Sequence, residues 1–417
     1  MAPVVRSLIL KGFRSLPNTQ IDFDNPTFLV GRNGAGKSNI GDALRFIAEA
    51  MTSGLREAID KRGGITSVRT QLSRKGLPKS FGLGVVCGVI EDVLQLGFHG
   101  EVESGRYAFE IGPLANYDFE VLREQCIIKF QDESTQWFDR HGNKGRTNIK
   151  GFDKIDFFTP SSLAMPIVAG AMPFEIVAQV LRRMKTYAIE PAALRELQDP
   201  DSGTDLRADG RNAASVFEEI ERRSPDSIER IKEILAAIVP NTTGLDTVQH
   251  GRKLALEFVQ AWDERNKLTF EAHSMSDGTL RALGLLLAVY QVQKPSLIFV
   301  DEPEASIHPG AAAAVLDTLR HAASTMQVVI STQSPEMLDA KWIEDRHIRG
   351  VVWQEGSTHI EEIPQNAKRA LRDHLMGAGE LFRSGVLEPS LTQQELKRPE
   401  VKLFEDIPNG HTANRRG

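Results

Sequence analysis

The sequence predicts an α/β protein built around a parallel sheet, with a β-rich lobe near the N-terminus and a helical insertion in the middle. Three observations support this fold class. Apolar stretches of strand length alternate with helical stretches, a glycine-rich loop separates one strand from one helix, and another apolar strand ends in two acidic residues. Strands inside a parallel sheet are buried on both faces, so continuous apolar runs are expected for them.

The elements follow from apolar spacing and from turn residues. Strands are predicted at Val4–Leu10, Thr27–Val30, Phe81–Val89, Val93–Phe98, Tyr107–Ile111, Cys126–Phe130, Leu254–Val259, Leu268–Ala272, Ser296–Val300, Gln327–Ile330 and Val351–Trp353. Helices are predicted at Ser38–Ala50, Phe174–Tyr187, Ala213–Ile238, Asp277–Val292 and Ala311–Ala323. The residues from Lys11 to Arg14 are expected to form the turn after the first strand.

These elements divide the chain into four parts. Residues 1–158 form the N-terminal half of a nucleotide-binding core with its β-rich subdomain, and residues 159–245 form the helical insertion. Residues 246–365 form the C-terminal half of the core, and residues 366–417 form a partly disordered extension. The chain beyond residue 388 is polar, so we expect a frayed tail there.

Composition and charge restrict the classes of function. The chain has 417 residues, 41% hydrophobic and 25% charged, which is typical of a globular protein with more than one subdomain. Its formal net charge is -6, so nucleic-acid binding would need a local basic patch. The two cysteines form no metal-ligand spacing, and no apolar run is long enough to span a bilayer. We expect a cytoplasmic protein without a membrane contact.

A phosphate-binding loop is predicted at Gly31–Ser38, which fits the pattern G-x-x-x-x-G-K-[ST]. Glycines let backbone N–H groups turn toward a phosphate, and the following helix adds its positive dipole end. In this pattern Lys37 reaches the β- and γ-phosphates, and the Ser38 hydroxyl binds Mg²⁺. The predicted ATP-binding residues are Arg32, Asn33, Gly34, Ala35, Gly36, Lys37, Ser38 and Asn39. A glycine turn without a ligand is the alternative, and the flanking strand and helix argue against it.

Two carboxylates, Asp301 and Glu302, follow the apolar strand. A carboxylate at such a strand end can hold Mg²⁺ opposite Ser38, and the next one can polarise an attacking water. Two surface acids after a core strand are the common alternative. That alternative is weakened by the segment Pro303–Pro309, which follows at once and contains Glu304 and His308.

A third and a fourth segment complete the pattern. Ser276, Asp277 and Gly278 precede a Leu-rich helix, where a hydroxyl and bare backbone can face a γ-phosphate. Taken alone, this turn is better explained as a helix cap, and both roles are compatible. Gln333 follows the strand Gln327–Ile330 and could sense a γ-phosphate, although an ordinary exit from a strand would look the same.

The order of these motifs resembles that of ABC-type ATPases, in the branch of RecF and SMC proteins. Within that branch the chain is similar to the predicted bacterial AAA-type ATPases related to the overcoming-lysogenization-defect (OLD) family. The matching pieces cover nearly the whole chain: LKGFRSL, VGRNGAGKSNIGDALRF, DGRNAASV, SDGTLRALGLLLAV, LIFVDEPEASIHP and VVISTQSPEML.

The resemblance implies an ABC-type ATPase head that uses ATP and Mg²⁺. It implies that Asp301 supports the metal and that Glu302 is the catalytic base, assisted by Lys37 and Gln333. It also implies that Ser276, Asp277 and Gly278 contact the triphosphate bound to the opposite subunit of a homodimer or higher homo-oligomer. Family members often carry His in place of Gln333, so we expect hydrolysis to be slower or differently sensed.

The role of the ATPase is open to three hypotheses. The first is an ATP-driven dimerising switch for a separate effector, such as a nuclease, in anti-phage defence or genome maintenance. It rests on the small remainder of chain after Trp353, which is too short for the C-terminal nuclease domain of OLD proteins. The second is a RecF-like DNA-binding ATPase in repair, which would use the basic stretch Arg56–Lys79. A solvated surface explains that stretch slightly better, because few aromatics interleave with its cations. The third, a transporter subunit, fits the helical insertion poorly.

Overall fold

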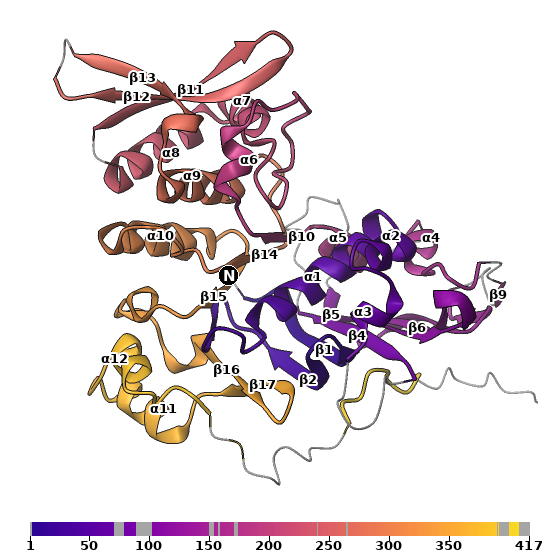
Figure 1. Ribbon diagram of the computed structural model, residues 1–417. Helices are drawn as coiled ribbons and strands as arrows, with labels where there is room; N and C mark the ends of the chain where they lie inside the picture. The colour runs from indigo at the N-terminus through magenta and orange to yellow at the C-terminus, as the bar shows by residue number, and fades with distance from the viewer. Residues whose placement is uncertain are drawn as a thin grey trace, which may run out of the picture.

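The fold comprises a central mixed sheet, an N-terminal lobe beside it and a smaller outer sheet above it (Figure 1). The structure is a computed structural model. It describes residues 2–70, 79–88, 102–149, 154–156, 159–170, 174–239, 241–263, 266–389, 391 and 400–407. For residues 154–156, 309 and 310 only the backbone is described.

The central sheet has the strand order β10-β14-β15-β3-β16-β17. Its strands are β10 Met184–Tyr187, β14 Leu297–Asp301, β15 Gln327–Thr332, β3 Thr27–Val30, β16 Ile348–Gln354 and β17 Ser357–Glu362. The first five run parallel, and β17 returns antiparallel to β16. Successive residues of the parallel strands enter two different hydrophobic cores, Phe299 on one face and Ile298 and Val300 on the other. This burial on both faces explains the continuous apolar runs.

The N-terminal lobe is built on an antiparallel sheet with the order β2-β1-β4-β5-β6-β7-β8-β9, called here the N-lobe sheet. Its strands are β1 Val5–Phe13, β2 Leu16–Asp22, β4 Phe81–Cys87, β5 Val102–Pro113, β6 Phe119–Phe130, β7 Thr135–His141, β8 Lys144–Thr147 and β9 Lys154–Asp156. The helices of this lobe are α1 Lys37–Thr52, α2 Leu55–Asp60, α3 Ile65–Val68, α4 Met165–Val168 and α5 Phe174–Arg182, and a short η1 spans Ala115–Tyr117.

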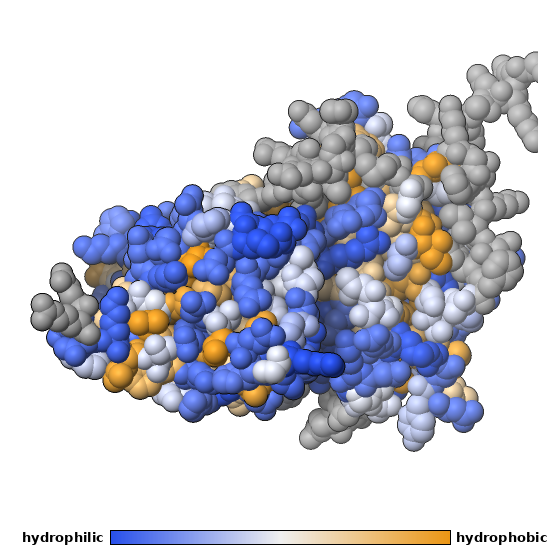
Figure 2. All heavy atoms as spheres, turned by 90° about the horizontal axis from the view of Figure 1, so that it is seen from above, coloured by the Kyte–Doolittle hydropathy of each residue, from blue (hydrophilic) through white to orange (hydrophobic). Residues whose placement is uncertain are grey.

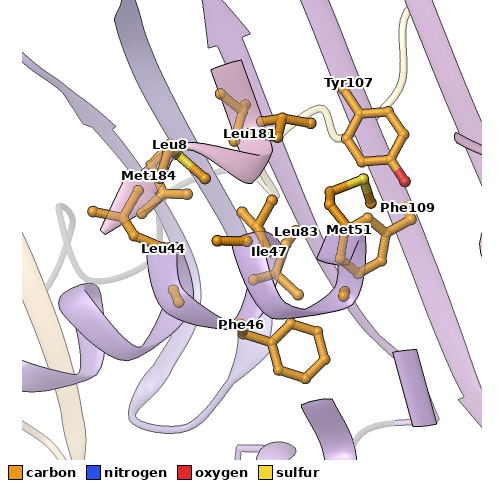
Figure 3. Packing of buried hydrophobic residues seen from close by; sticks show 14 of the residues in the cluster. Leu8, Leu44, Phe46, Ile47, Met51, Leu83, Tyr107, Phe109, Leu181 and Met184 are labelled. Atoms are coloured by element: carbon orange, nitrogen blue, oxygen red, sulfur yellow. The ribbon is translucent and has the colours of Figure 1, made fainter. Parts of the chain in front are cut away.

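Helix α1 joins the N-lobe sheet to the central sheet. Figure 3 shows its side chains, including Phe46 and Ile47, packed among residues of β1, β4 and β5. On another face α1 approaches the central sheet so closely that a Cβ on Gly41 would lie 2.5 Å from the Phe299 ring in β14. The Thr186 hydroxyl of β10 donates to the Gly41 carbonyl over 3.2 Å. The helix after the phosphate loop is therefore fixed against the strand that carries the two acidic residues.

The other face of the central sheet is covered by helices and by the outer sheet. The helices are α6 Pro191–Arg195, α7 Ala213–Arg223, α8 Pro225–Ile238, α9 Asp277–Tyr290 and α10 Pro309–Ala322. The outer sheet consists of β11 Thr242–His250, β12 Lys253–Ala261 and β13 Lys267–Glu271. Seen from above in Figure 2, the exposed surface is largely hydrophilic, with hydrophobic residues scattered through it.

The remaining elements surround the ends of the central sheet. They are η2 Ala272–Ser274, η3 Pro335–Leu338, η4 Asp345–His347, α11 Gln365–Arg372 and α12 Ala378–Arg383. Among the described residues, no helix combines the length and the apolar character needed to span a membrane.

Three expectations about local structure were wrong. Strand β1 continues to Phe13, which pairs with Leu16, so the turn begins only at Arg14. The helix expected over Phe174–Tyr187 ends at Arg182. The last residues of that range instead form strand β10, which pairs with β14. The segment 159–245, expected to be a helical insertion, therefore also carries a strand of the central sheet.

The third error concerns the helix expected over Ala213–Ile238. It is two helices that break at Ser224, because Pro225 lacks an N–H for the preceding turn and starts a new helix instead. The predicted strand at Val93–Phe98 lies outside the described residues.

The frayed tail expected beyond residue 388 falls largely outside the described residues. Residues 392–399 and 408–417 lie outside the described residues, but residues 400–407 are described and packed. Leu403 is only 5% exposed and contacts Ile9 and Ala108 on the N-lobe sheet. Composition alone does not predict this contact, because a single apolar side chain in a complementary space is enough to hold a polar segment.

Candidate active site

Three parallel strands of the central sheet end at one edge. Val30, the last residue of β3, lies opposite Thr332 of β15, and Ser331 lies opposite Asp301 of β14. The phosphate loop, the acidic pair Asp301 and Glu302, and the segment from Gln333 onward, called here the switch segment, each begin at these strand ends. The register alone therefore brings the three motifs together. Ligands of open α/β sheets bind at this edge.

The phosphate loop is shaped by two glycines and held by a threonine. Gly34 and Gly36 have φ angles of 76° and 100°, which side chains of L-residues rarely adopt. A Cβ on Gly36 would lie 2.0 Å from Oγ1 of Thr358. The Thr358 hydroxyl donates to the Ala35 carbonyl over 2.9 Å and lies 2.7 Å from the Ser15 hydroxyl. The loop is therefore braced from β17 rather than from the strand that it follows.

Lys37 is directed into the loop. Its side chain is 4% exposed, and its Nζ donates to the carbonyls of Gly31 and Arg32 over 2.8 and 3.1 Å. The same Nζ lies 3.6 Å from a carboxylate oxygen of Glu302. The ammonium group and the second acid of the acidic pair are thus direct neighbours.

The other predicted residues of the loop differ in their surroundings. Asn33, Gly34 and Ser38 are exposed at the mouth of the loop, and Ala35 is buried. The Asn39 amide donates to the Ser15 hydroxyl over 2.6 Å. Arg32 is 80% exposed and pairs with Glu388 at 2.7 Å.

The acidic pair is oriented by β15. The Ser331 hydroxyl donates a short hydrogen bond to Asp301, and the backbone N–H of Glu302 donates to the Ser331 carbonyl over 3.1 Å. Glu302 has a φ angle of 45°, so the chain turns sharply as the strand ends. The Gln333 amide donates to a Glu302 carboxylate oxygen over 3.3 Å. Glu302 is therefore held between Lys37 and Gln333.

A third carboxylate, that of Glu304, accepts hydrogen bonds from the residues where β15 ends and the switch segment begins. One of its oxygens accepts hydrogen bonds from the Thr332 hydroxyl at 2.6 Å and from the Gln333 backbone N–H at 3.3 Å. Its other oxygen is buried and has no hydrogen-bond partner among the residues that the structure describes. Burial raises the pKa of Glu304, and the two donated hydrogen bonds only partly offset that rise.

The turn Ser276–Gly278, called here the signature turn, caps α9 and lies against the segment after the acidic pair. The Ser276 hydroxyl accepts from the Thr279 N–H over 3.2 Å, so the predicted cap is present. Ser276 and Asp277 are exposed, and Arg195 of α6 pairs with Asp277 at 2.6 Å. A Cβ on Gly278 would lie 2.4 Å from the Ser306 carbonyl.

The basic stretch Arg56–Lys79 is largely committed to internal contacts where the structure describes it. Arg62 is 5% exposed and pairs with Asp42 and Glu49 at 2.8 and 2.5 Å. Arg56 pairs with Asp118 at 2.7 Å, and Lys61 pairs with Glu57 at 2.8 Å. Arg74 and Lys75 lie outside the described residues. Arg62 therefore cannot serve a nucleic-acid phosphate in this conformation.

The donor chemistry at this edge suits a nucleoside triphosphate with a magnesium ion. Bare backbone around Gly34 and the start of α1 favour phosphate oxygens, and Lys37 adds a buried cation. The exposed hydroxyl of Ser38 and the carboxylate of Asp301 are hard oxygen ligands of the kind that Mg²⁺ prefers.

The fold and this edge define an ABC-type P-loop ATPase head. Two solved structures of SMC heads have the same fold. One is bound to the C-winged helix domain of ScpA, with a TM-score of 0.53 and 15% identity over 88% of this chain and 100% of that chain. The other carries an extended coiled coil and the C-terminal domain of ScpA derived from Pyrococcus furiosus, with a TM-score of 0.54 and 14% identity over 89% and 99%.

The chain belongs to the family described as "AAA domain, putative AbiEii toxin, Type IV TA system", whose profile matches residues 27–339. It is 24% identical over 360 residues to the Old nuclease of Escherichia phage P2, covering 80% of this chain and 57% of the nuclease. It is 31% identical over 227 residues to the ribose import ATP-binding protein RbsA of Ruegeria sp. (strain TM1040), covering 52% and 40%. The chain thus spans about half the length of these relatives. The resemblance to OLD-like and ABC-type ATPases is confirmed.

Sequence reasoning missed the residues that brace the motifs. Thr358 and Ser15 hold the phosphate loop, and Arg195 holds the signature turn. None of them lies in the motif that it supports. Glu304 lies in the segment after the acidic pair, and only its burial marks it as more than a surface acid.

We expect Glu304→Gln to stabilise the protein increasingly as the pH rises. A raised pKa means that the folded state holds the proton more tightly than the unfolded state. The stability from that proton is present below the ordinary carboxyl pKa of about 4.3 and is lost as the pH rises through the raised pKa. A neutral glutamine avoids this loss and still accepts from Thr332 and Gln333.

Thermal unfolding of wild type and variant between about pH 4 and pH 8 would measure the difference, which should widen as the pH rises from the ordinary carboxyl pKa to the raised one. Glu336→Gln, at an exposed carboxylate of the neighbouring η3, is the control. A difference that stays constant with pH would show that Glu304 is ionised throughout.

Proposed function

We propose that the chain is an ATP-hydrolysing switch that dimerises on ATP and controls a partner effector. The observation that carries this proposal is the meeting of Lys37, Glu302 and Gln333 at one sheet edge, while Ser276 and Asp277 remain exposed to a second copy. The chain's ATPase family membership supports the use of ATP.

Nucleotide binding falls to the phosphate loop. Backbone N–H groups of Asn33 to Ser38 surround the phosphates, and the Lys37 ammonium leaves the carbonyls of Gly31 and Arg32 to meet them. Ser38 and Asp301 would hold Mg²⁺, which neutralises phosphate charge when bound.

Hydrolysis falls to Glu302 and Gln333. The Glu302 carboxylate accepts a proton from the attacking water, and the Gln333 amide, which already donates to Glu302, orients that carboxylate and senses the γ-phosphate. The 3.6 Å contact between Lys37 and Glu302 must open when phosphates enter, because Lys37 changes partner. Nucleotide entry therefore releases Glu302 for the water.

The second half of each site comes from another copy of the chain. Ser276 and Asp277 are exposed at the start of α9, and such a helix start suits a γ-phosphate. Two copies placed head to tail would each complete the site of the other, and C2 symmetry would make both sites equal.

The effector is proposed to act in anti-phage defence, and a nuclease is the first candidate. Support comes from the likeness to the Old nuclease, of which the chain matches 57%, and from the toxin description of the family. In this proposal ATP-bound dimerisation changes the surface that the effector contacts, and hydrolysis resets it.

We expect Glu302→Gln to accumulate as an ATP-bound dimer, because it binds ATP but removes the proton acceptor. Lys37→Ala should fail to bind ATP and stay monomeric. Light scattering after gel filtration, with ATP and Mg²⁺ and then with ADP, distinguishes the two. Arg320→Ala on the exposed face of α10 is a control that should behave as wild type. Identical elution of both site variants in ATP would contradict the proposed dimer.

A mixing experiment tests whether the site is shared. Ser276→Arg places a bulky cation at the signature and should abolish ATPase activity, as should Lys37→Ala. An equal mixture should recover activity, to at most about half of wild type, since ATP can join only mixed dimers and each of these has one intact site of two. A mixture as inactive as its components would show that each chain completes its own site.

The role in defence is tested by plating phage on cells that express the chain with its neighbouring genes. We expect Lys37→Ala and Ser276→Arg to lose protection together, since both prevent the ATP-bound dimer. Lys61→Ala, in the basic stretch, is the control and should retain protection. If phage plating is unchanged in all variants and survival after DNA damage falls instead, the repair hypothesis is correct.

A further inference from the structure

Residues 400–407, called here the strap, lie along the outer face of the N-lobe sheet. This face is opposite to the one that packs on α1, as the alternation of β1 shows: Leu8 and Leu10 join the core around α1, and Ile9 contacts the strap residue Leu403. The strap is the yellow segment beneath the N-lobe sheet in Figure 1. It has no helix or strand of its own.

The sheet presents a matched space for Leu403. Outward positions of β4 are occupied by Gly82 and Gly84, and the outward position of β5 beside them is Ala108. A Cβ on Gly82 would lie 2.3 Å from a methyl group of Leu403, and one on Gly84 would lie 3.2 Å from the other. Two adjacent outward glycines in a strand are costly unless something approaches closely. The absence of side chains at these positions makes a pocket, and Leu403 fills it.

The backbone of the strap is bound by side chains of the sheet. The Asn18 side-chain oxygen accepts from the Val401 N–H over 2.6 Å. Gln125 both accepts from the Glu405 N–H over 2.9 Å and donates to the Glu405 carbonyl over 3.1 Å. Side chains that bind both backbone groups of one residue are a mode of peptide recognition, because they hold an extended segment whatever its own side chains are.

Charge and aromatic contacts add selectivity at the two ends. Glu400 pairs with Lys11 at 2.8 Å, and Glu405 pairs with Arg106 at 3.1 Å. Arg106 also donates to the Leu403 carbonyl over 3.1 Å. The Arg123 guanidinium lies 4.4 Å from the centre of the Phe404 ring, within the range of a cation–π contact.

We propose that the outer face of β1, β4, β5 and β6 is a binding groove for an extended acidic peptide, and that the strap is the ligand it holds in cis. The groove is defined by Gly82, Gly84, Gln125 and Arg106. It takes a segment with an apolar pair between two acids, as in Glu400–Glu405. It lies apart from the ATP site, and this proposal does not depend on the function of that site.

A partner with such an acidic segment reaches the groove only by displacing the strap. The strap is part of the same chain, so it competes at an effective concentration of about millimolar. Weak ligands therefore do not bind the groove of the wild-type chain. The groove is therefore a regulated site, open only when the strap leaves.

The test uses a fluorescein-labelled peptide with the sequence of residues 400–407 and measures its anisotropy against the full chain. Leu403→Asp should release the strap and bind the peptide at least about ten times more tightly than wild type does, because the intramolecular competitor is gone. Adding Gly84→Val to Leu403→Asp fills the pocket and should weaken peptide binding by about tenfold or more. A peptide with aspartate at both apolar positions is the ligand control.

Folding of each variant is checked by circular dichroism and thermal unfolding, so a failed variant is recognised. A folded Leu403→Asp chain that binds no peptide would overturn the proposal and make the strap a merely structural tail. Wild type that binds the peptide as tightly as Leu403→Asp would overturn the occupancy in cis. A wild-type dimer that Leu403→Asp converts to monomer would assign the strap to the groove of another copy instead.

Discussion

The parallel register of β14, β15 and β3 is the constraint on which the site depends. Asp301 lies opposite Ser331, and Thr332 lies opposite Val30, so the three strands end at the same level of the sheet. A shift of one residue would turn the side chains of a strand to the opposite face and remove Asp301 from the Ser331 hydroxyl. Burial on both faces, with separate cores below and above, makes such a shift costly. Packing along the interior of these strands therefore fixes the positions of the side chains at their ends.

One short segment connects the two parts of this chain that contribute to the two proposed composite sites. The chain leaves β14 at Asp301, and five residues later the Ser306 carbonyl lies under Gly278 at the start of α9. Both ends of this segment have left-handed backbone, with φ angles of 45° at Glu302 and 65° at Ser306. Such angles are retained only where the surroundings impose them. Under the proposed function, a change at Glu302 on nucleotide entry can therefore reach the signature turn through the five residues from Glu302 to Ser306.

The motifs and the strands that carry them could be predicted from the sequence, and their surroundings could not. Gly31–Ser38, Asp301 and Gln333 lie beside or within apolar runs whose burial is unmistakable, so their positions at strand ends followed directly.

Thr358 escaped prediction because its role arises from tertiary contact. Nothing in a short polar strand such as β17 indicates a hydrogen bond to a loop more than 300 residues earlier. Strand β10 escaped because its four residues continue the spacing of α5, and only pairing with β14 decides their conformation. The strap escaped because glycines inside a predicted strand do not indicate which distant side chain fills the space beside them.

The two hydrogen bonds of Gln333 explain what a glutamine contributes at this position. Its side-chain amide donates to Glu302, and its backbone N–H donates to Glu304, so one residue connects two carboxylates. A histidine at this position would add a group that titrates near neutral pH between those acids. Glutamine donates the same kind of hydrogen bond without changing charge. Under the proposed function, the orientation of Glu302 then depends on the position of Gln333 and on the binding of a second copy. Protonation of residue 333 plays no part.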